Sequence, residues 1–357
     1  MPRITSVCVT SRELKLRHPF ATSRDAAPRL TSTCVRALLR TDDGRDGIGD
    51  AASAPYVTGE TAPTLLCDMQ RAVEALVGSD PADAEGLNRR LLTLLPDRPS
   101  ARAGVEMALL RCRHGGDDMQ LWRSLGGARR ALTTDTTISI TDQAPLQIDD
   151  AVAAGFTRLK VKVGGEGPEA EAGRLRALMA GAGHAAVRVD ANQAFTAPEA
   201  LEFIDRLMQA SVNLEFVEQP VPAADLAALD AVAHGSPVPI LADEAVLTPQ
   251  DAVRVLERTS VYGVNVKLMK SGIAGALEII ALVQQARRRL MLGCMLESAC
   301  GIACSVAVAA GTGAFTYVDL DSHMLLDDPE AGTWLDWRGP QLALPGLIDH
   351  TTEERHG

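Results

Sequence analysis

Short β-branched segments recur between residues 134 and 321, and most of them end in a charged residue. Successive ends are 28, 28, 25, 24, 30 and 22 positions apart, at Lys162, Asp190, Glu218, Asp243, Lys267, Glu297 and Asp319. One strand, one helix and two loops need about that length of chain. With a first strand at residues 134–139, the pattern predicts eight βα units, which is typical of a parallel (β/α)8 barrel.

Helical segments with clear start signals lie between these strands. Thr196 and Glu199 form a capping box with a proline in the first turn, and the apolar residues that follow fall on one face. Thr248 and Asp251 begin a later helix in the same way. An open doubly wound sheet is the alternative arrangement of such units. The barrel is favoured because charged residues end nearly every strand, which places them around one mouth.

The first third of the chain has a different pattern. Residues 7–14 and 33–51 are β-branched runs broken by the turn signal Asp43-Gly44, and residues 62–126 have a helical pattern. These segments predict a small α+β domain at residues 1–125, followed by the barrel at residues 126–325, which holds the active site.

The composition excludes some classes of function. The formal net charge is -11, which argues against binding to nucleic acids or anionic membranes, because both need a basic surface. The longest apolar stretch, at residues 300–310, is shorter than the ~20 residues that a bilayer needs, and no signal peptide is expected. Seven scattered cysteines without a CxxC pair indicate reduced thiols, neither disulfides nor a zinc site, and a cytoplasmic protein.

Three acidic residues end consecutive predicted strands, and they are Asp190, Glu218 and Asp243. In a barrel they would lie side by side at the rim, where three oxygen ligands without Cys or His suit Mg²⁺. The alternative is that each acid caps a helix or pairs with a lysine. Repulsion among three neighbouring carboxylates favours the metal site, because it would be costly without a cation.

Lysines stand on either side of these acids in the sequence. Lys160 and Lys162 are two residues apart on one strand, so both point to the same face. Lys267 ends a strand beyond the acids, so the lysines on the two sides would face each other across the metal. Lys160 and the cation would favour the neutral amine of Lys162, which can then act as a base. The alternative is lysines that extend to the surface, and Lys270 is expected to be structural.

This combination describes a reaction class. The cation binds a substrate carboxylate, a base removes the proton α to it, and the cation stabilises the enediolate that results. A second lysine on the opposite face returns the proton from the other side. Such a 1,1-proton transfer is a racemisation or an epimerisation.

The segments LKVKVGG, VDANQAF, EQP, ADE and NVKLMKSG, in this order, resemble the enolase superfamily in its muconate-lactonizing subgroup. The resemblance covers residues 1–350. It implies that residues 1–125 cap the barrel and that residues 326–357 pack back onto this capping domain. It also implies Mg²⁺ on the three acids, acid/base roles for Lys162 and Lys267, Lys160 as their electrostatic neighbour, and a homo-oligomer. The mandelate racemase subgroup is disfavoured, because Lys267 stands where its Asp would.

The eighth predicted strand distinguishes members of this subgroup. Asp319 and Asp321 lie two residues apart on one face, and paired carboxylates suit a free ammonium group. This DxD resembles that of dipeptide epimerases, which implies a small dipeptide as substrate and inversion at its C-terminal residue. The alternatives are an N-acylamino-acid racemase or a cycloisomerase on the same site. A metal-binding barrel without catalytic activity is a further alternative, which the two lysines argue against.

Loops of the capping domain are expected to cover the pocket, at residues 19–28 and 53–61. Arg24 resembles an arginine with which Ala-Glu epimerases bind the substrate glutamate. Asp25, Glu60 and Glu297 are expected to make the pocket partly acidic, which favours a neutral or basic dipeptide over an acidic one.

Overall fold

The computed structural model describes residues 1–116 and 118–348, and a ring of eight parallel strands forms its centre. Each strand pairs with the next one along the chain. The strands are β5 (Thr136–Ile138), β6 (Arg158–Lys162), β7 (Ala186–Asp190), β8 (Leu214–Glu218), β9 (Ile240–Ala242), β10 (Gly263–Val266), β11 (Arg289–Leu292) and β12 (Tyr317–Val318). The N–H of Asp135 donates to the carbonyl of Val318 at 3.3 Å, which joins the first strand to the last. The predicted barrel is confirmed.

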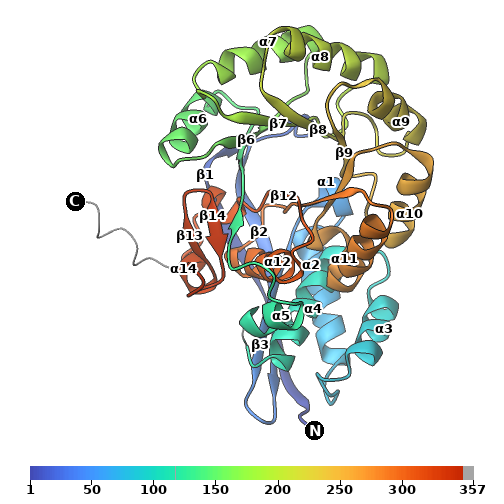
Figure 1. Cartoon of the computed structure of the whole chain (residues 1–357). Coiled ribbons are helices and arrows are strands. Elements are labelled where there is room, and N and C mark those ends of the chain that lie inside the picture. The colour runs from blue at the N-terminus through green and yellow to red at the C-terminus, as the bar shows by residue number, and fades with distance from the viewer. Residues whose placement is uncertain (117, 349–357) are drawn as a thin grey trace.

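Seven helices connect these strands and lie outside them, as α7, α8 and α9 show in Figure 1. They are α6 (Ala144–Ala153), α7 (Pro168–Met179), α8 (Ala197–Gln209), α9 (Leu226–Gly235), α10 (Pro249–Arg258), α11 (Leu268–Gln285) and α12 (Ala299–Thr312). Both predicted capping boxes are present, at the starts of α8 and α10.

The eighth unit and the seventh strand differ from the prediction. Strand β12 is followed by the short helices α13 (Ser322–Leu325) and α14 (Ala331–Trp334), so the last unit has no full crossover helix within the described residues up to 348. Strand β11 ends at Leu292, so Glu297 lies in the loop before α12 and does not end a strand. The spacing of charged residues predicted Glu297 at a strand end, because spacing alone does not distinguish a short strand with a long loop from a longer strand.

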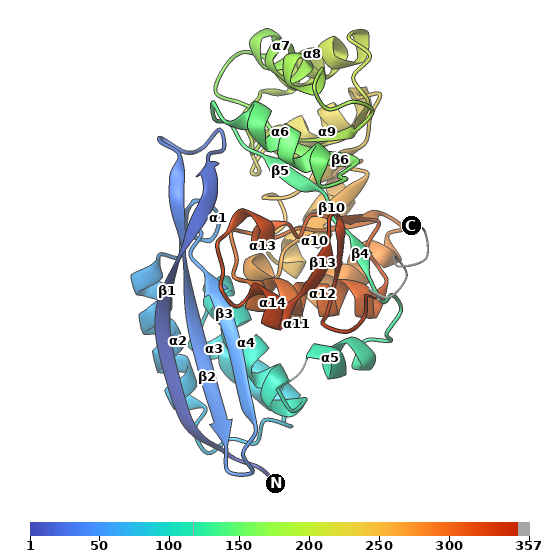
Figure 2. The same cartoon turned by 90° about the vertical axis from the view of Figure 1, so that its left-hand side faces the viewer.

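An antiparallel sheet and, in the described part of the chain, five helices precede the barrel. The sheet contains β1 (Ile4–Phe20), β2 (Arg29–Thr41) and β3 (Asp46–Ala52), with the turn at Asp43-Gly44 between the last two. The main helices are α2 (Ala62–Ala75), α3 (Ala84–Leu94), α4 (Pro99–Arg113) and α5 (Asp118–Ser124), and the short α1 (Pro55–Thr58) follows the sheet. Figure 2 shows β1 and β2 extending along one side of the barrel, and the predicted α+β character of this region is confirmed.

Helix α4 connects the two parts, because it packs against both β3 and α11. Its contact with the sheet requires glycines on β3. A Cβ atom added to Gly47 would lie 2.0 Å from the carbonyl oxygen of Ala108, and one added to Gly49 would lie 2.0 Å from that of Gly104. The backbones of strand and helix therefore approach more closely than any larger residue allows.

Replacing Gly49 with alanine is expected to lower the free energy of unfolding by about 1–3 kcal/mol, because the added methyl group forces the helix away from the strand. Denaturant unfolding followed by circular dichroism measures this change. The matched control is Gly173→Ala on α7, where nothing lies within 4 Å of the added Cβ. An unchanged unfolding midpoint for Gly49→Ala would show that the contact is not as close as described.

The C-terminal segment returns across the molecule to the first sheet. The N–H of Asp327 donates to the carbonyl of Lys15 at 2.8 Å, and Arg36 of β2 pairs with Glu330 at 2.8 Å. After α14 (Ala331–Trp334), the hairpin of β13 (Asp336–Arg338) and β14 (Gln341–Ala343) pairs with β4 (Leu132–Thr133), just before the barrel. The predicted segment extends to residue 357, and its residues 349–357 lie outside the described part.

Helices long and apolar enough to cross a lipid bilayer are absent from residues 1–116 and 118–348.

Candidate active site

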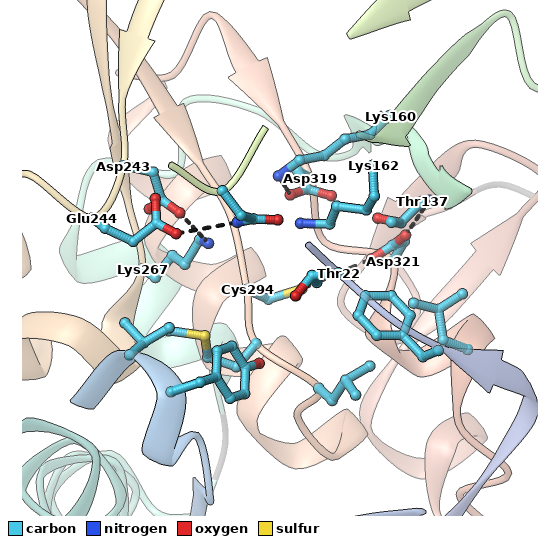
Figure 3. A pocket seen from close by; sticks show the side chains of 17 residues that line it. Thr22, Thr137, Lys160, Lys162, Asp243, Glu244, Lys267, Cys294, Asp319 and Asp321 are labelled. Carbon is cyan, nitrogen blue, oxygen red and sulfur yellow. Dashed lines mark hydrogen bonds and ion pairs between the residues drawn. The ribbon is translucent and has the colours of Figure 1, made fainter. Parts of the chain in front are cut away.

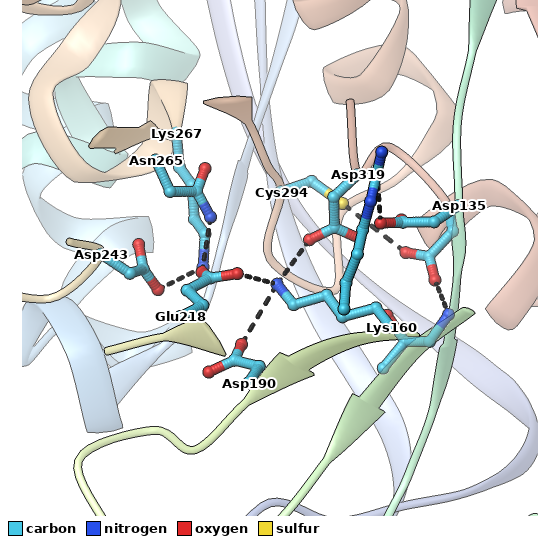
Figure 4. A network of polar contacts seen from close by, with 12 residues as sticks. Asp135, Lys160, Asp190, Glu218, Asp243, Asn265, Lys267, Cys294 and Asp319 are labelled. Carbon is cyan, nitrogen blue, oxygen red and sulfur yellow. Dashed lines mark hydrogen bonds and ion pairs between the residues drawn. The ribbon is translucent and has the colours of Figure 1, made fainter. Parts of the chain in front are cut away.

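The three predicted acids meet at the carboxyl ends of neighbouring strands. Asp190 ends β7, Glu218 ends β8 opposite it in register, and Asp243 follows β9. One carboxylate oxygen from each lies within 4.8 Å of the other two, and all three residues are buried (Figure 4). The parallel sheet creates this cluster, because equivalent positions of adjacent strands reach the same rim.

The electrostatics of the cluster fit a divalent cation. Burial, together with the charge of Asp190, raises the pKa of Glu218 to about 7. Burial also opposes the ionisation of Asp190, but Lys162 and Lys160 outweigh it and lower the pKa of that carboxyl to about 2. Three crowded oxygen ligands with no nitrogen or sulfur among them match the preference of Mg²⁺.

Lys162 and Lys267 approach the cluster from opposite sides. The Nζ of Lys162 lies 2.6 Å from the carboxylate of Asp190, and the Nζ of Lys267 lies 2.8 Å from that of Asp243. Lys162 belongs to β6 and Lys267 follows β10, which is four strands away in the ring of eight. Figure 3 shows both ammonium groups pointing into one pocket, toward each other.

Lys160 is buried among acids. Its Nζ lies 2.7 Å from Asp319, 2.9 Å from Glu218 and 3.1 Å from Asp190, as Figure 4 shows. Burial alone would lower the pKa of Lys160, but these carboxylates outweigh it and raise the pKa. Lys160 therefore supplies a fixed positive charge to the acids, in addition to being a neighbour of Lys162 on the same strand.

Lys270 lies nearer to the site than the sequence indicated. Its buried Nζ donates to a carboxylate oxygen of Asp243 at 2.6 Å and to the carbonyl of Asn265 at 2.8 Å. The side chain of Asn265 in turn donates to Glu218 at 2.7 Å. Both residues hold the acids in place. Asn265 could have been found from strand alternation, because it lies two residues before Lys267 and so shares its face.

The lysine content is a further signal that sequence reasoning missed. The chain contains only five lysines, and all except Lys15 lie in this site: Lys160, Lys162, Lys267 and Lys270. Arginine supplies nearly all other basic groups. Lysine can give up its proton in proteins whereas arginine cannot, which suits Lys162 and Lys267 to proton transfer, while Lys160 and Lys270 hold the acids.

Asp319 and Asp321 line the pocket beside Lys160. One oxygen of Asp321 accepts from the N–H of Thr137 at 2.5 Å, and the other lies 4.0 Å from the thiol of Cys294. Burial and then the charge of Asp319 raise the pKa of Asp321 to about 6. Two adjacent buried carboxyl groups of this kind are chemically suited to bind a cationic group.

The pocket is covered by residues from both loops that were expected to cover it. Phe20 and Thr22 come from residues 19–28, and Tyr56 and Val57 come from residues 53–61. Lining residues that the sequence did not reveal include Asn192, together with Thr137, Glu244 and Cys294, which Figure 3 shows.

The expectation of a pocket made acidic by Asp25, Glu60 and Glu297 needs correction, because none of them is among the described residues that line it. Asp25 accepts from the N–H of Thr22 at 2.8 Å and pairs with Arg29 at 2.9 Å. Glu60 accepts two backbone N–H groups at the start of α4, each at 2.9 Å.

Glu297 and Arg24 are also placed beside the pocket and not in its lining. Glu297 accepts from the N–H of Met295 at 2.9 Å within its own loop. The guanidinium of Arg24 lies 3.9 Å from Glu244. Burial raises the pKa of Glu297 to about 7, although the backbone N–H of Met295 and the nearby charge of Lys267 act in the opposite direction.

Comparison with known families gives two matches that together span most of the chain. Residues 4–126 match the N-terminal domain of mandelate racemase and muconate lactonizing enzyme, and residues 144–347 match the enolase C-terminal domain-like family.

Proteins similar to this chain include several epimerases. An L-Ala-D/L-Glu epimerase from Clostridium acetobutylicum is 33% identical over 340 residues, covering 93% of this chain and 94% of the relative. A hydrophobic dipeptide epimerase from Citrifermentans bemidjiense is 35% identical over 321 residues, covering 87% of this chain and 86% of the relative.

Solved structures show the same fold. The substrate-liganded L-Ala-D/L-Glu epimerase from Bacillus subtilis superposes with a TM-score of 0.89 at 30% identity, covering 96% of both chains. The dipeptide epimerase from Enterococcus faecalis, in complex with Mg and L-Leu-L-Tyr, gives a TM-score of 0.88 at 29% identity, covering 96% of this chain and 97% of that one.

Proposed function

Because this chain belongs to the enolase superfamily and is an isomerase of the epimerase type, we propose that it is a Mg²⁺-dependent dipeptide epimerase. The reaction would invert the α-carbon of the C-terminal residue of a dipeptide. The observation that carries this proposal is the pair of lysines that face each other across one pocket, beside three clustered acids and a second pair of acids.

The lysines would act on the two faces of the α-carbon. One of them takes the α-proton from one face, and the other delivers a proton to the opposite face, which inverts the centre. Their positions four strands apart fit this division, because a substrate held between them presents one face to each. Lys160 would keep the surrounding carboxylates ionised and in place.

Asp190, Glu218 and Asp243 would hold the metal ion. When bound, Mg²⁺ supplies positive charge that stabilises the negative charge developing on the substrate carboxylate. Lys270 and Asn265 would orient these acids through the hydrogen bonds described above.

Asp319 and Asp321 favour a dipeptide over the other substrates of such sites. An α-ammonium group would lie against the two carboxylates, which also fixes the distance from the N-terminus to the reacting carbon. N-acylamino acids and cycloisomerase substrates have no ammonium group in this place. The two opposed lysines argue against a metal-binding barrel without activity, because binding alone needs neither base.

Replacing Asp321 with asparagine is expected to reduce the preference for free over N-acetylated dipeptides by about 10- to 100-fold, because the ammonium loses one charged partner. The ratio of kcat/KM for the two substrates measures this preference. Asp327→Asn, at an exposed position six residues later, is the matched control. An unchanged ratio in Asp321→Asn would refute the ammonium assignment, and a wild-type protein that prefers N-acylamino acids would support the racemase.

A further inference from the structure

The charged residues that line the pocket already have partners or places in the chemistry. Among the described lining residues, the proposed reaction uses Lys160, Lys162, Lys267, Asp243, Asp319 and Asp321. The remaining charged one is Glu244, which accepts from the side chain of Asn192 at 3.2 Å and has Arg24 at 3.9 Å. The other oxygen of Glu244 is buried without a hydrogen-bond partner among the described residues. Apart from this oxygen, a substrate side chain meets no charge in the lining that the proposed reaction leaves unused.

The side of the pocket that faces these charged residues is an apolar wall. We use this name for Phe20, Tyr56, Val57, Met295, Leu296 and Leu325, which all line the pocket. The first three come from the capping loops, and the others come from the loop after β11 and from α13. The wall thus combines two parts of the chain, and it would contact whatever extends from the substrate backbone.

An ion pair behind the wall holds its aromatic residues. The guanidinium of Arg29 lies 5.4 Å from the ring centre of Phe20 and 4.3 Å from that of Tyr56. Its charge is paired with Asp25 at 2.9 Å, and the same carboxylate oxygen accepts from both the N–H and the hydroxyl of Thr22. Asp25 and Arg29 therefore act as positioning residues for three lining side chains, and neither lines the pocket.

We propose that the substrates are dipeptides whose two side chains are uncharged and largely apolar, and that the apolar wall selects them. This inference rests on the proposed epimerase function. A carboxylate or ammonium placed against the wall would lose its hydration without gaining a partner, whereas an apolar side chain gains by leaving water. The wall is preorganised by the Asp25–Arg29 pair, so little ordering is needed when the substrate binds.

The test is α-proton exchange in D2O with Mg²⁺, measured by mass spectrometry on separate dipeptides. L-Ala-L-Leu, L-Ala-L-Phe and L-Leu-L-Ala are expected to have kcat/KM values about 100-fold above those of L-Ala-L-Glu and L-Ala-L-Lys. A preference for L-Ala-L-Glu, or for L-Ala-L-Lys through Glu244, would overturn the proposal. Exchange with N-acylamino acids and with no dipeptide would instead refute the proposed function, so the two failures are distinguishable.

Variants distinguish an effect on substrate selection by the apolar wall from an effect on the stability of the protein. Tyr56→Ala is expected to lower kcat/KM for L-Ala-L-Phe about tenfold relative to L-Ala-L-Ala, because the smaller substrate does not need the ring. Arg29→Gln is expected to raise KM for L-Ala-L-Phe about tenfold with kcat retained, and Arg29→Lys is expected to restore part of the affinity. Arg40→Gln is the matched control, because Arg40 lies on β2 with Arg29 and the change breaks an exposed ion pair with Asp46 of β3. Equal effects on large and small substrates would overturn the assignment of these residues.

Discussion

Replacing Lys162 or Lys267 with alanine is expected to lower kcat for epimerisation by about 10²- to 10⁴-fold, the range for loss of a positioned acid or base. Both ammonium groups point into the pocket from opposite sides, so under the proposed mechanism each face of the α-carbon would have one proton carrier. Polarimetry or chiral chromatography measures the interconversion. The matched control is Lys15→Ala, because Lys15 is exposed on β1 and is the one lysine outside the site.

The single-lysine variants also distinguish two bases from one. Each variant is expected to exchange the α-proton of only that epimer whose proton faces the remaining lysine, and to return deuterium with retention. Incubation of each pure epimer in D2O, followed by mass spectrometry, measures this. Full epimerase activity in either variant would contradict the two-base mechanism.

Removing the metal is expected to abolish activity, with a loss of about 10³-fold or more, because the negative charge on the substrate carboxylate is then left without a counter-charge. Treatment with EDTA followed by addition of Mg²⁺ tests this, and activity should return. Asp190→Asn and Glu218→Gln are expected to prevent the recovery, while Asp205→Asn, at an exposed position on α8, is the control.

Thermal unfolding tests metal binding by a measurement that is independent of activity. Mg²⁺ is expected to raise the thermal midpoint of the wild-type protein, because a ligand that binds only the folded state stabilises it, and to have a smaller effect on Glu218→Gln. Full activity after exhaustive treatment with EDTA would contradict a role for the metal.

The placement of the central site residues could be predicted because it depends on strand ends. Residues at the carboxyl ends of parallel strands must meet at one rim, so the order Lys162, Asp190, Glu218, Asp243, Lys267 in the sequence becomes a ring in space. The capping boxes at Thr196 and Thr248 could be predicted because they are local. The hydrogen bonds of each box form within four consecutive residues.

Features that depend on loops could not be predicted in this way. Glu297 has the right spacing for a strand end, but its loop turns it toward its own backbone. Asp25 lies in a loop that covers the pocket, yet Thr22 and Arg29 take up its charge. The role of a loop residue depends on which partner lies within hydrogen-bonding distance of it in the folded chain. The sequence does not give that distance.

Contacts between distant segments were also beyond sequence reasoning. Lys270 lies in the helix after β10, but the turn that follows Lys267 carries its amine back to Asp243. The apolar wall joins Tyr56 to Met295, which are far apart in the chain. Neither relation follows from periodicity, because each needs the positions of two loops in space.

The most direct test of the proposed function is incubation of the protein with Mg²⁺ and a pooled library of L,L-dipeptides in D2O, read by mass spectrometry. A gain of one mass unit is predicted for a subset of dipeptides, together with appearance of the L,D epimers. The absence of exchange in every dipeptide, with exchange in an N-acylamino acid, would contradict the dipeptide epimerase.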